Sequence, residues 1–295
     1  MSWLAAFRRP LPAFAAASAL AVGVGAAVCA LSGVPEGVWG RNLAAWLVGA
    51  LAAMALSRFA GVRTLAAVAL VAPLGVAAAM LFDGQQGVHR WLGLGPVYIN
   101  AAMLLLPPLV VAVGALAERW SWWWMPALLT LAVLVLQPDA SQASALALAI
   151  CVAGFSTSSA RVKVGIALGA TALAALSWTR PDPLAPVPEV EEVIGLAARQ
   201  SPWLAGLAVL ALAAFAVTPA LSARGTAARS TGYALSALFL FWSLAPALGA
   251  FPVPLVGMGL SPILGAWLGV GLLAATMRAR TEPGAAAEFR RGERA

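Results

Sequence analysis

Long apolar runs alternate with short polar segments along the chain, and this pattern predicts ten helices that cross a membrane. A hydrocarbon core about 30 Å thick needs roughly 20 apolar residues at a helical rise of about 1.5 Å per residue. The apolar runs lack the every-second-residue alternation of membrane β-strands, so helices are the default. The predicted spans are 12–32, 42–57, 64–82, 97–117, 121–137, 142–158, 162–178, 203–221, 231–250 and 256–277.

The composition places most of the chain in lipid. Hydrophobic residues make up 62% and charged residues 10% of the 295 positions, and the mean hydropathy is +0.91. A soluble domain of this length cannot hide that much apolar surface. We therefore expect an all-α polytopic membrane protein with a single transmembrane domain over residues 1–277. Its first run follows Arg8 and Arg9 but, at about 20 residues, exceeds a signal-peptide core of roughly 7–15, so we interpret it as a retained helix.

The distribution of basic residues predicts the orientation. With a cytoplasmic N-terminus and ten spans, 14 of the 18 Lys and Arg residues fall on the cytoplasmic side and both termini lie there. Lys and Arg near span ends favour the cytoplasmic side, so this asymmetry supports ten crossings. Outside remain Arg41, Arg90, Arg180 and Arg199 together with seven acidic residues. If one helix fewer or one helix more crossed the membrane, every later loop would lie on the opposite side.

Charge and cysteine content exclude other classes of site. The calculated pI is about 10.9, but the arginines flank the spans, which indicates membrane lipids rather than nucleic acid as partners. Residues 278–295 are polar and basic, and we expect a disordered cytoplasmic tail along anionic lipid headgroups. Cys29 and Cys151 lie inside apolar runs, so neither a disulfide framework nor a cysteine metal site is indicated.

The predicted outer loop 82–96, FDGQQGVHRWLGLGP, carries Arg90 beside Trp91. As a membrane anchor, Trp91 would lie at headgroup depth and Arg90 would extend to a lipid phosphate. As part of a binding site, Arg90 would bind a ligand phosphate, helped by backbone N–H groups near the glycines. Both interpretations are open.

The outer turn LQPDASQ, residues 136–142, contains Asp139 three residues before Gln142. This spacing is typical of a capping box that opens the following helix, which explains the aspartate without catalysis. A catalytic or binding role is the alternative.

The stretch RPDPLAPVPEVEEVIGLAARQ, residues 180–200, holds four of the chain's 11 acidic residues between two apolar runs. Prolines stiffen it, which is unusual for a merely solvated turn. Carboxylates such as Glu191 and Glu192, held at the start of a helix, can act as general bases or bind a divalent cation. A solvated acidic turn is the alternative.

Three stretches, in this order, resemble the SEDS family, the ten-helix membrane glycosyltransferases typified by RodA, FtsW and SpoVE. GVHRWLGLGPVYIN (87–100) is similar to the family's G-x-R-R-W-L-x-L-G-P segment, and LQPDASQASALAL (136–148) to its Q-P-D-L-G-T-A stretch. ALGAFPVPLVGMGLSPILGAWLGVGLL (247–273) resembles T-G-L-P-L-P-F-V-S-Y-G-G-S-S and the last helix. The matches extend over most of the chain.

The resemblance implies a peptidoglycan glycosyltransferase that polymerises undecaprenyl-linked lipid II at the outer face of the bacterial inner membrane. In the family, an aspartate in the loop between helices seven and eight helps deprotonate an acceptor sugar hydroxyl. Setting the family's DFIFAVIAEELGFLG against this chain without gaps, so that its final F-L meets Trp203-Leu204, puts that aspartate on Glu191. The implied substrate-binding residues are Arg90, Trp91, Asp139 and Arg180. A divalent cation, Mg or Mn, and a class B penicillin-binding protein with transpeptidase activity are the implied cofactor and partner.

The chain departs from the family pattern at several motif positions. Val190-Glu191-Glu192 stands for threonine-aspartate-phenylalanine, Met258 and Leu260 replace a tyrosine and a glycine, and the loop before Glu191 is short. These departures motivate a second hypothesis, a non-catalytic scaffold or regulator that binds lipid-linked precursor or a transpeptidase. A transporter needs ionisable residues inside the bilayer. Because each charged residue can be placed in a loop or at a helix end, the transporter ranks last.

Overall fold

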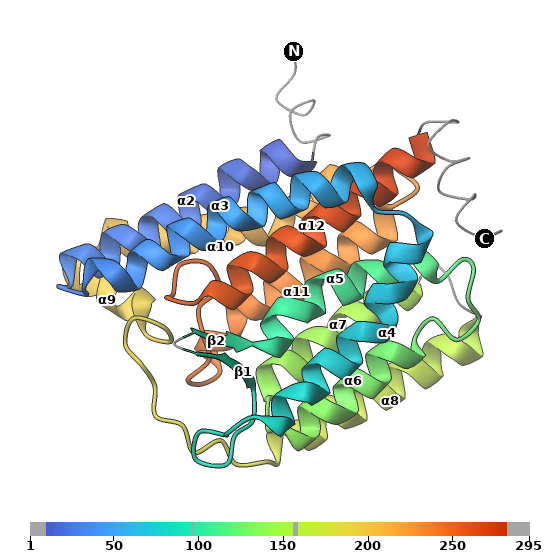
Figure 1. Ribbon diagram of the computed structural model, residues 1–295, viewed down its shortest axis with the longest axis horizontal. Coiled ribbons are helices and arrows are strands. Elements are labelled where there is room, and N and C mark those ends of the chain that lie inside the picture. The colour runs from blue at the N-terminus through green and yellow to red at the C-terminus, as the bar shows by residue number, and fades with distance from the viewer. Residues whose placement is uncertain (1–9, 96, 156–158, 282–295) are drawn as a thin grey trace.

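The computed structural model describes residues 10–95, 97–155 and 159–281, and these form a nearly all-helical bundle (Figure 1). Two short strands, β1 (Trp91–Leu94) and β2 (Val97–Asn100), pair as an antiparallel hairpin. Single 3₁₀ turns follow two of the helices, at Ala79–Leu81 and Ala245–Ala247. The helices, labelled as in Figure 1, are α2 (Pro10–Leu31), α3 (Glu36–Phe59), α4 (Val62–Ala78), α5 (Ala101–Leu116), α6 (Met125–Leu136), α7 (Ala140–Phe155), α8 (Ala160–Trp178), α9 (Val193–Gln200), α10 (Pro202–Ala223), α11 (Arg229–Leu244) and α12 (Leu260–Thr281).

The fold agrees with the predicted polytopic membrane protein. In the described ranges, α2, α3, α4, α8, α10 and α12 are long and apolar enough to cross a membrane, α4 being counted with its 3₁₀ extension to Leu81. Helices α5, α6 and α7 are shorter and apolar, and α11 has 16 residues. With α11, the described residues contain ten helices whose ends lie within six residues of the predicted spans, and six of these helices meet the length and hydropathy of a membrane span.

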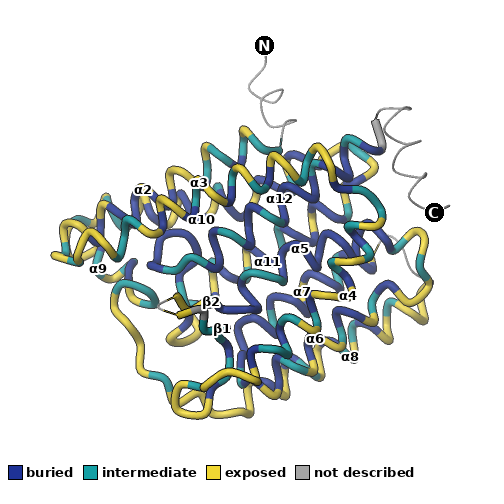
Figure 2. The backbone as a smooth tube through the Cα atoms, viewed as in Figure 1, coloured by how far each residue is buried: buried dark blue, intermediate teal, exposed yellow. Residues whose placement is uncertain are grey.

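Helices α5 and α12 occupy the centre of the bundle. Nearly every residue of α5 is buried, and α12 packs against both α3 and α5. Figure 2 shows dark blue, buried backbone through the middle of the bundle and yellow, exposed positions on the outer helices. Exposed apolar side chains such as Leu51 on α3 and Leu168 on α8 line that outer surface, as expected for helices whose solvent is lipid.

The largest differences from the prediction fall at the loops of one end. The fourth span begins at Ala101 rather than 97, because residues 97–100 pair with β1 across a turn at Gly95, whose φ is +61°. The ninth span ends at Leu244 instead of 250, and the tenth begins at Leu260 instead of 256. The predicted ends were wrong there because hydropathy does not distinguish apolar loop residues from helix. The short helix α9 was also not predicted as a separate element.

The two ends of the bundle differ in charge. Pro10, at the start of α2, and Arg278, in the last turns of α12, line the same cavity, so the first and last described helices meet at one end. Arg58 and Arg224 lie at that end as well. The hairpin and the acidic 180–192 segment lie at the opposite end (Figure 1). This arrangement agrees with the even number of crossings that the charge distribution predicts. The tail predicted for 278–295 is helical through Thr281, and the remainder lies outside the described residues.

Candidate functional site

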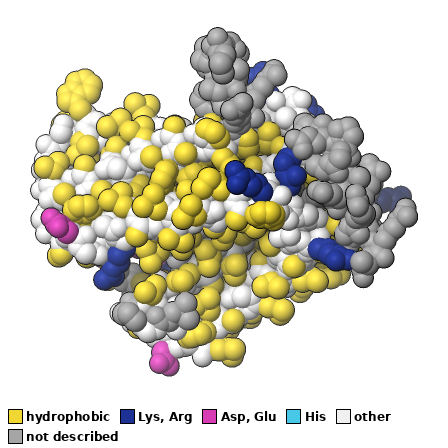
Figure 3. Space-filling model, turned by 45° about the horizontal axis from the view of Figure 1, so that its top comes forward, with side chains coloured by type: hydrophobic (Ala, Val, Ile, Leu, Met, Phe, Trp, Pro, Cys, Tyr) yellow, Lys and Arg dark blue, Asp and Glu magenta, His cyan; other side chains and the backbone are white. Residues whose placement is uncertain are grey.

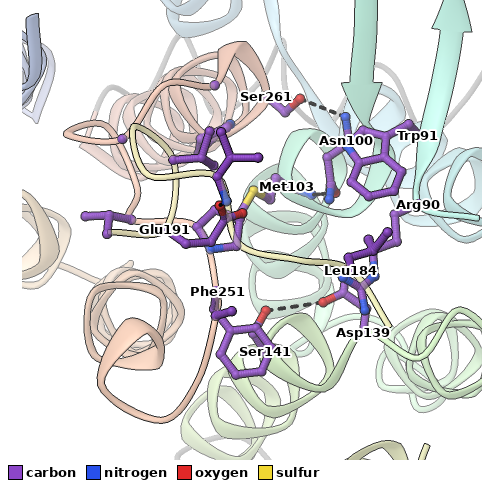
Figure 4. A pocket seen from close by; sticks show the side chains of 18 of the residues that line it. Arg90, Trp91, Asn100, Met103, Asp139, Ser141, Leu184, Glu191, Phe251 and Ser261 are labelled. Atoms are coloured by element: carbon purple, nitrogen blue, oxygen red, sulfur yellow. Dashed lines mark hydrogen bonds and ion pairs between the residues drawn. The ribbon is translucent and has the colours of Figure 1, made fainter. Parts of the chain in front are cut away.

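A cavity of about 260 Å³, shown in Figure 4, lies at the end of the bundle that carries the hairpin. Four segments that are far apart in the sequence form its walls: the hairpin region, the α6–α7 turn, the proline-stiffened segment before α9 and the loop before α12. We name it the carboxylate cavity. Its charged lining residues are Arg90, Asp139, Asp182 and Glu191.

Arg90 joins three of these segments. It directly precedes β1 and is buried. Its Nη2 donates to Asp182 Oδ2 at 2.8 Å, and its Nε lies 3.6 Å from Asp139 Oδ2. The guanidinium also donates to the backbone carbonyls of Gln137 and Pro138 in the α6–α7 turn. A planar group with five donors can hold several oxygens at once, so Arg90 connects the hairpin to both the turn and the acidic segment.

Asp139 makes the aspartate half of the predicted capping box, whereas the Gln142 side chain contacts Ser141 and Trp242 instead of returning to Asp139 N–H. It immediately precedes α7, and its Oδ1 accepts from the backbone N–H of Gln142 at 3.4 Å and from the Ser141 hydroxyl at 3.2 Å. Burial raises the pKa of the Asp139 carboxyl above its ordinary value of 3.8, against the opposing attraction of Arg90. The side chain therefore caps a helix and faces Arg90 at the cavity wall.

Glu191 lies on the other side of the cavity from Arg90 and Asp139 (Figure 4). It is half-buried in the turn before α9, and its Oε2 accepts from the backbone N–H of Val187 at 2.7 Å. Burial raises the pKa of Glu191 above its ordinary value of 4.5, while the hydrogen bond from Val187 lowers it. A carboxylate with a raised pKa in a cavity is a candidate general base.

The backbone around Glu191 is attached to the loop before α12. Val253 N–H donates to Val190 O at 3.0 Å, and Met258 N–H donates to Glu189 O at 2.8 Å. At Gly257 a Cβ would overlap the carbonyl oxygen of Val190, so only glycine permits this close approach. The prolines and these bonds together fix the position of the carboxylate.

Asn42 holds the same loop from the side of α3. It is buried, its Nδ2 donates to Gly257 O at 3.0 Å, and its Oδ1 accepts from Gly259 N–H at 3.1 Å. Sequence reasoning missed Asn42, although an asparagine at the first position of the predicted span 42–57 was a visible signal, because a buried polar side chain needs a partner.

Three further polar contacts at or near the cavity were also missed. Asn100 caps α5 by accepting from Met103 N–H at 2.9 Å, and its own N–H donates to the Ser261 hydroxyl at 2.8 Å (Figure 4). Behind the α7 cap, Trp242 donates to Gln142 Oε1 at 2.7 Å. The last two contacts link residues from different predicted spans, so local spacing gave no signal for them.

Of the remaining predicted site residues, one lines the carboxylate cavity and two lie outside it. Trp91 lines the carboxylate cavity and is half-buried. Glu192 and Arg180 are exposed and lie outside the lining of the carboxylate cavity. The structure thus brings together Arg90, Trp91, Asp139 and Glu191, adds Asp182 to them, and leaves Glu192 and Arg180 at the surface.

The residues present do not fit a divalent-cation site made by the protein. Among the side chains that the structure describes, no three of His, Cys, Asp and Glu gather in a way that could hold a metal ion. Calcium takes six to eight oxygen ligands, and magnesium is usually held by one or two carboxylates together with substrate phosphates rather than by protein groups alone. Asp139 and Asp182 already face Arg90.

Comparison with known proteins gives a fold match. No protein-family model matches the chain, and the comparison with curated protein sequences found no match. The rod shape determining protein RodA of Thermus thermophilus superimposes with a TM-score of 0.65 at 20% identity, over 91% of this chain and 97% of that one. An aspartate-to-alanine mutant of the same RodA gives 0.67 at 21% identity with the same coverage.

A third structure comes from a peptidoglycan synthase complex that coordinates polymerization and crosslinking. It matches with a TM-score of 0.65 at 19% identity, over 91% of this chain and 98% of that one. Three nearly complete superpositions agree with the resemblance of the three motif stretches. The chain has the SEDS-like fold of RodA.

Proposed function

We propose that this protein is a SEDS-like peptidoglycan glycosyltransferase that polymerises undecaprenyl-linked lipid II at the outer face of the bacterial inner membrane, in cell-wall synthesis, shape or division. The observation that carries the proposal is the position of Glu191. Its carboxylate lines a cavity at the expected outer end of a RodA-like bundle, fixed by Val187 N–H and opposite a buried arginine.

In the proposed reaction, ionised Glu191 accepts the proton of an acceptor sugar hydroxyl. The hydroxyl oxygen then attacks the anomeric carbon of the donor sugar, the bond from that carbon to the diphosphate oxygen breaks, and undecaprenyl diphosphate leaves with the bonding electrons. A raised pKa suits this role because a general base is most effective when its pKa approaches the working pH. The backbone bonds around residues 187–191 keep the base in place, since displacement of about 1 Å can lower a rate roughly a hundredfold.

Arg90 is the proposed group that binds the departing diphosphate. Of its two carboxylate partners, Asp139 is buried, whereas the side chain of Asp182 is 28% exposed. A diphosphate can therefore replace Asp182 on the guanidinium without disturbing the α7 cap. Trp91 beside it supplies an apolar face at headgroup depth. We assign no catalytic role to Arg180 or Glu192, which are exposed.

The test uses a matched pair of neighbouring glutamates. Purified protein is supplied with labelled lipid II, and glycan chains are measured by gel electrophoresis for the wild type, Glu191→Gln and Glu192→Gln. Loss of a general base lowers rates by about 10²-fold or more, so Glu191→Gln should lose at least that much activity and Glu192→Gln should retain nearly all of it. Equal activity in both variants would remove Glu191 from the mechanism.

A second candidate function is a non-catalytic scaffold, favoured by one observation. Arg90 is already held by two carboxylates and two carbonyls, as in an arginine whose role is structural. In that case the protein would bind lipid-linked precursor, or a class B penicillin-binding protein that crosslinks. One of the structural neighbours comes from a peptidoglycan synthase complex that coordinates polymerization and crosslinking, and this supports a crosslinking partner. Absence of polymer from the wild type, with and without such a transpeptidase, would favour the scaffold.

A further inference from the structure

A second cavity, of about 590 Å³, lies at the opposite end of the bundle from the carboxylate cavity. The start of α2 and the ends of α3, α10 and α12 surround it. We name it the arginine cavity, after the three basic residues that line it: Arg58, Arg224 and Arg278. Among the described residues of its lining, none is acidic.

At the arginine cavity, Arg278 links α12 to the end of α3. From α12 its Nε donates to Ser57 O at 3.0 Å, and its Nη2 donates to Arg58 O at 2.8 Å. These carbonyls belong to the last turn of α3, where backbone acceptors have no partner within the helix. The contact fixes α12 against α3 and places a positive charge at the negative end of the α3 dipole.

Arg58 and Arg224 are placed differently. Both are exposed and lie at helix ends, Arg58 in the last turn of α3 and Arg224 directly after α10. Gly225 follows with a φ of +76°, which turns the chain back toward α11. Each helix end offers only about half a negative charge to neighbouring cations. Arg58 and Arg224 therefore place positive charge beside the arginine cavity that an anion would neutralise.

The rest of the lining is apolar. Leu11, Ala274 and Met277 contribute to the arginine cavity, and the exposed apolar side chains of Met54 and Phe59 lie on α3 near Arg58. Figure 3 shows apolar side chains over this flank of the bundle, with basic side chains beyond them toward one end. An occupant with a phosphate at one end and hydrocarbon at the other matches such a surface. Basic pockets between spanning helices bind acidic lipid headgroups in this way.

We propose that the arginine cavity is a binding site for an anionic phospholipid of the leaflet at the end of the bundle where α2 begins. Arg58 and Arg224 bind its phosphodiester, while Arg278 positions the end of α3 and adds to the positive potential. The acyl chains lie along the apolar outer surface of α3. Guanidinium groups suit this role because they pair with phosphate oxygens through two parallel N–H donors.

The experiment compares lipids and soluble phosphates with full-length protein in a neutral detergent. Binding of phosphatidylglycerol and phosphatidylcholine is measured by native mass spectrometry, together with the shift in the unfolding temperature. We expect phosphatidylglycerol to bind more tightly and to raise the unfolding temperature. Each lost charge-assisted hydrogen-bonding group weakens binding roughly tenfold, so Arg58→Gln/Arg224→Gln should abolish the preference.

Matched controls keep the outcome interpretable. Arg161→Gln/Lys163→Gln removes two charges at the start of α8, at the same end of the bundle but outside the arginine cavity, and should retain the preference. Arg58→Lys/Arg224→Lys keeps the charge and should retain part of it, which provides a folded comparison if the glutamine variant is unstable. Equal loss in the α8 control, or no loss in the glutamine variant, overturns the proposal. Equal stabilisation by inorganic phosphate or glycerol 3-phosphate also overturns it, in favour of a soluble phosphate ligand.

Discussion

Arg90 and Asp182 lie 92 positions apart in the chain and meet at the rim of the carboxylate cavity, with Nη2 and Oδ2 separated by 2.8 Å. Asp182 belongs to the proline-stiffened segment, where its Oδ1 also accepts from Leu184 N–H at 3.3 Å. The ion pair therefore ties the segment that carries Glu191 to the hairpin on the other side of the cavity. Because the Asp182 side chain is 28% exposed, water and a ligand can reach this contact.

The two carboxylate partners of Arg90 should respond differently to mutation. Arg90→Gln leaves the buried Asp139 without its cation, and breaking such a pair lowers the free energy of unfolding by about 3 kcal/mol or more. Asp182→Asn removes a partly exposed pair, for which about 1 kcal/mol or less is expected. Denaturant unfolding in detergent measures both changes.

The double variant Arg90→Gln/Asp139→Asn is the control for this prediction. It removes the unpaired buried charge, so it should recover much of the stability lost in Arg90→Gln. If the double variant is less stable than Arg90→Gln, the loss does not arise from the uncompensated Asp139 charge.

The pH dependence of stability should report the raised pKa of Glu191. Because burial raises this pKa above 4.5, the native state binds the proton more tightly than the unfolded chain does. The stabilisation that this provides is fully present below the unfolded pKa and is lost as pH rises through the folded pKa. Glu191→Gln does not titrate, so the unfolding temperature of this variant should increase relative to that of the wild type as pH rises above the ordinary value of 4.5. A difference that stays constant with pH would contradict the raised pKa.

The polymerisation activity of the wild type should also depend on the ionisation of Glu191. It should rise with pH over the range in which the stabilisation from protonated Glu191 is lost. As a general base Glu191 works only when ionised, so the polymerisation rate should fall on the acidic side with a midpoint above the ordinary value of 4.5. Initial rates from labelled lipid II across pH measure this midpoint. A midpoint at or below that value would indicate that another group limits the rate. Glu192→Gln should leave the profile unchanged.

The sequence could predict which loops share an end of the bundle, because charge asymmetry determines how many times the chain crosses the membrane. That parity alone places Arg90, Asp139 and Glu191 at one end, and the structure brings them to one cavity. The sequence could not predict that Asp182 pairs with Arg90, or that Asn42 hydrogen-bonds to the loop at Gly257. Such partners depend on how packed helices are rotated and shifted along their axes, and hydropathy carries no information on either.

Asn42 should prove important for the cavity although it does not line it. Asn42→Asp retains an acceptor for Gly259 N–H but loses the donor to Gly257 O, and it buries a charge. An unmatched buried polar group lowers stability by about 1–3 kcal/mol. Since Met258 N–H in this loop donates to Glu189 O, the position of Glu191 should change as well. We expect lower polymerisation by Asn42→Asp than by Asn42→Gln, measured with labelled lipid II and normalised to folded protein by size-exclusion chromatography. Equal activity would show that the loop does not position the base.

The close contact of α12 with α5 should make one glycine irreplaceable. A Cβ on Gly265 would overlap the carbonyl oxygen of Met103 and come within 2.8 Å of Leu104 O, so α12 would have to move away from α5. Overpacking of this kind lowers stability by about 1–3 kcal/mol. A Cβ added at Gly206 in α10 would meet no atom within 4 Å, and the same change there should stabilise the helix by about 0.5–1 kcal/mol. Unfolding temperatures of Gly265→Ala and Gly206→Ala should therefore move in opposite directions. Because Leu260 and Ser261 in the first turn of α12 line the carboxylate cavity, Gly265→Ala should also reduce polymerisation, whereas Gly206→Ala should not. A stable and fully active Gly265→Ala would show that the contact between α5 and α12 is looser than the structure indicates.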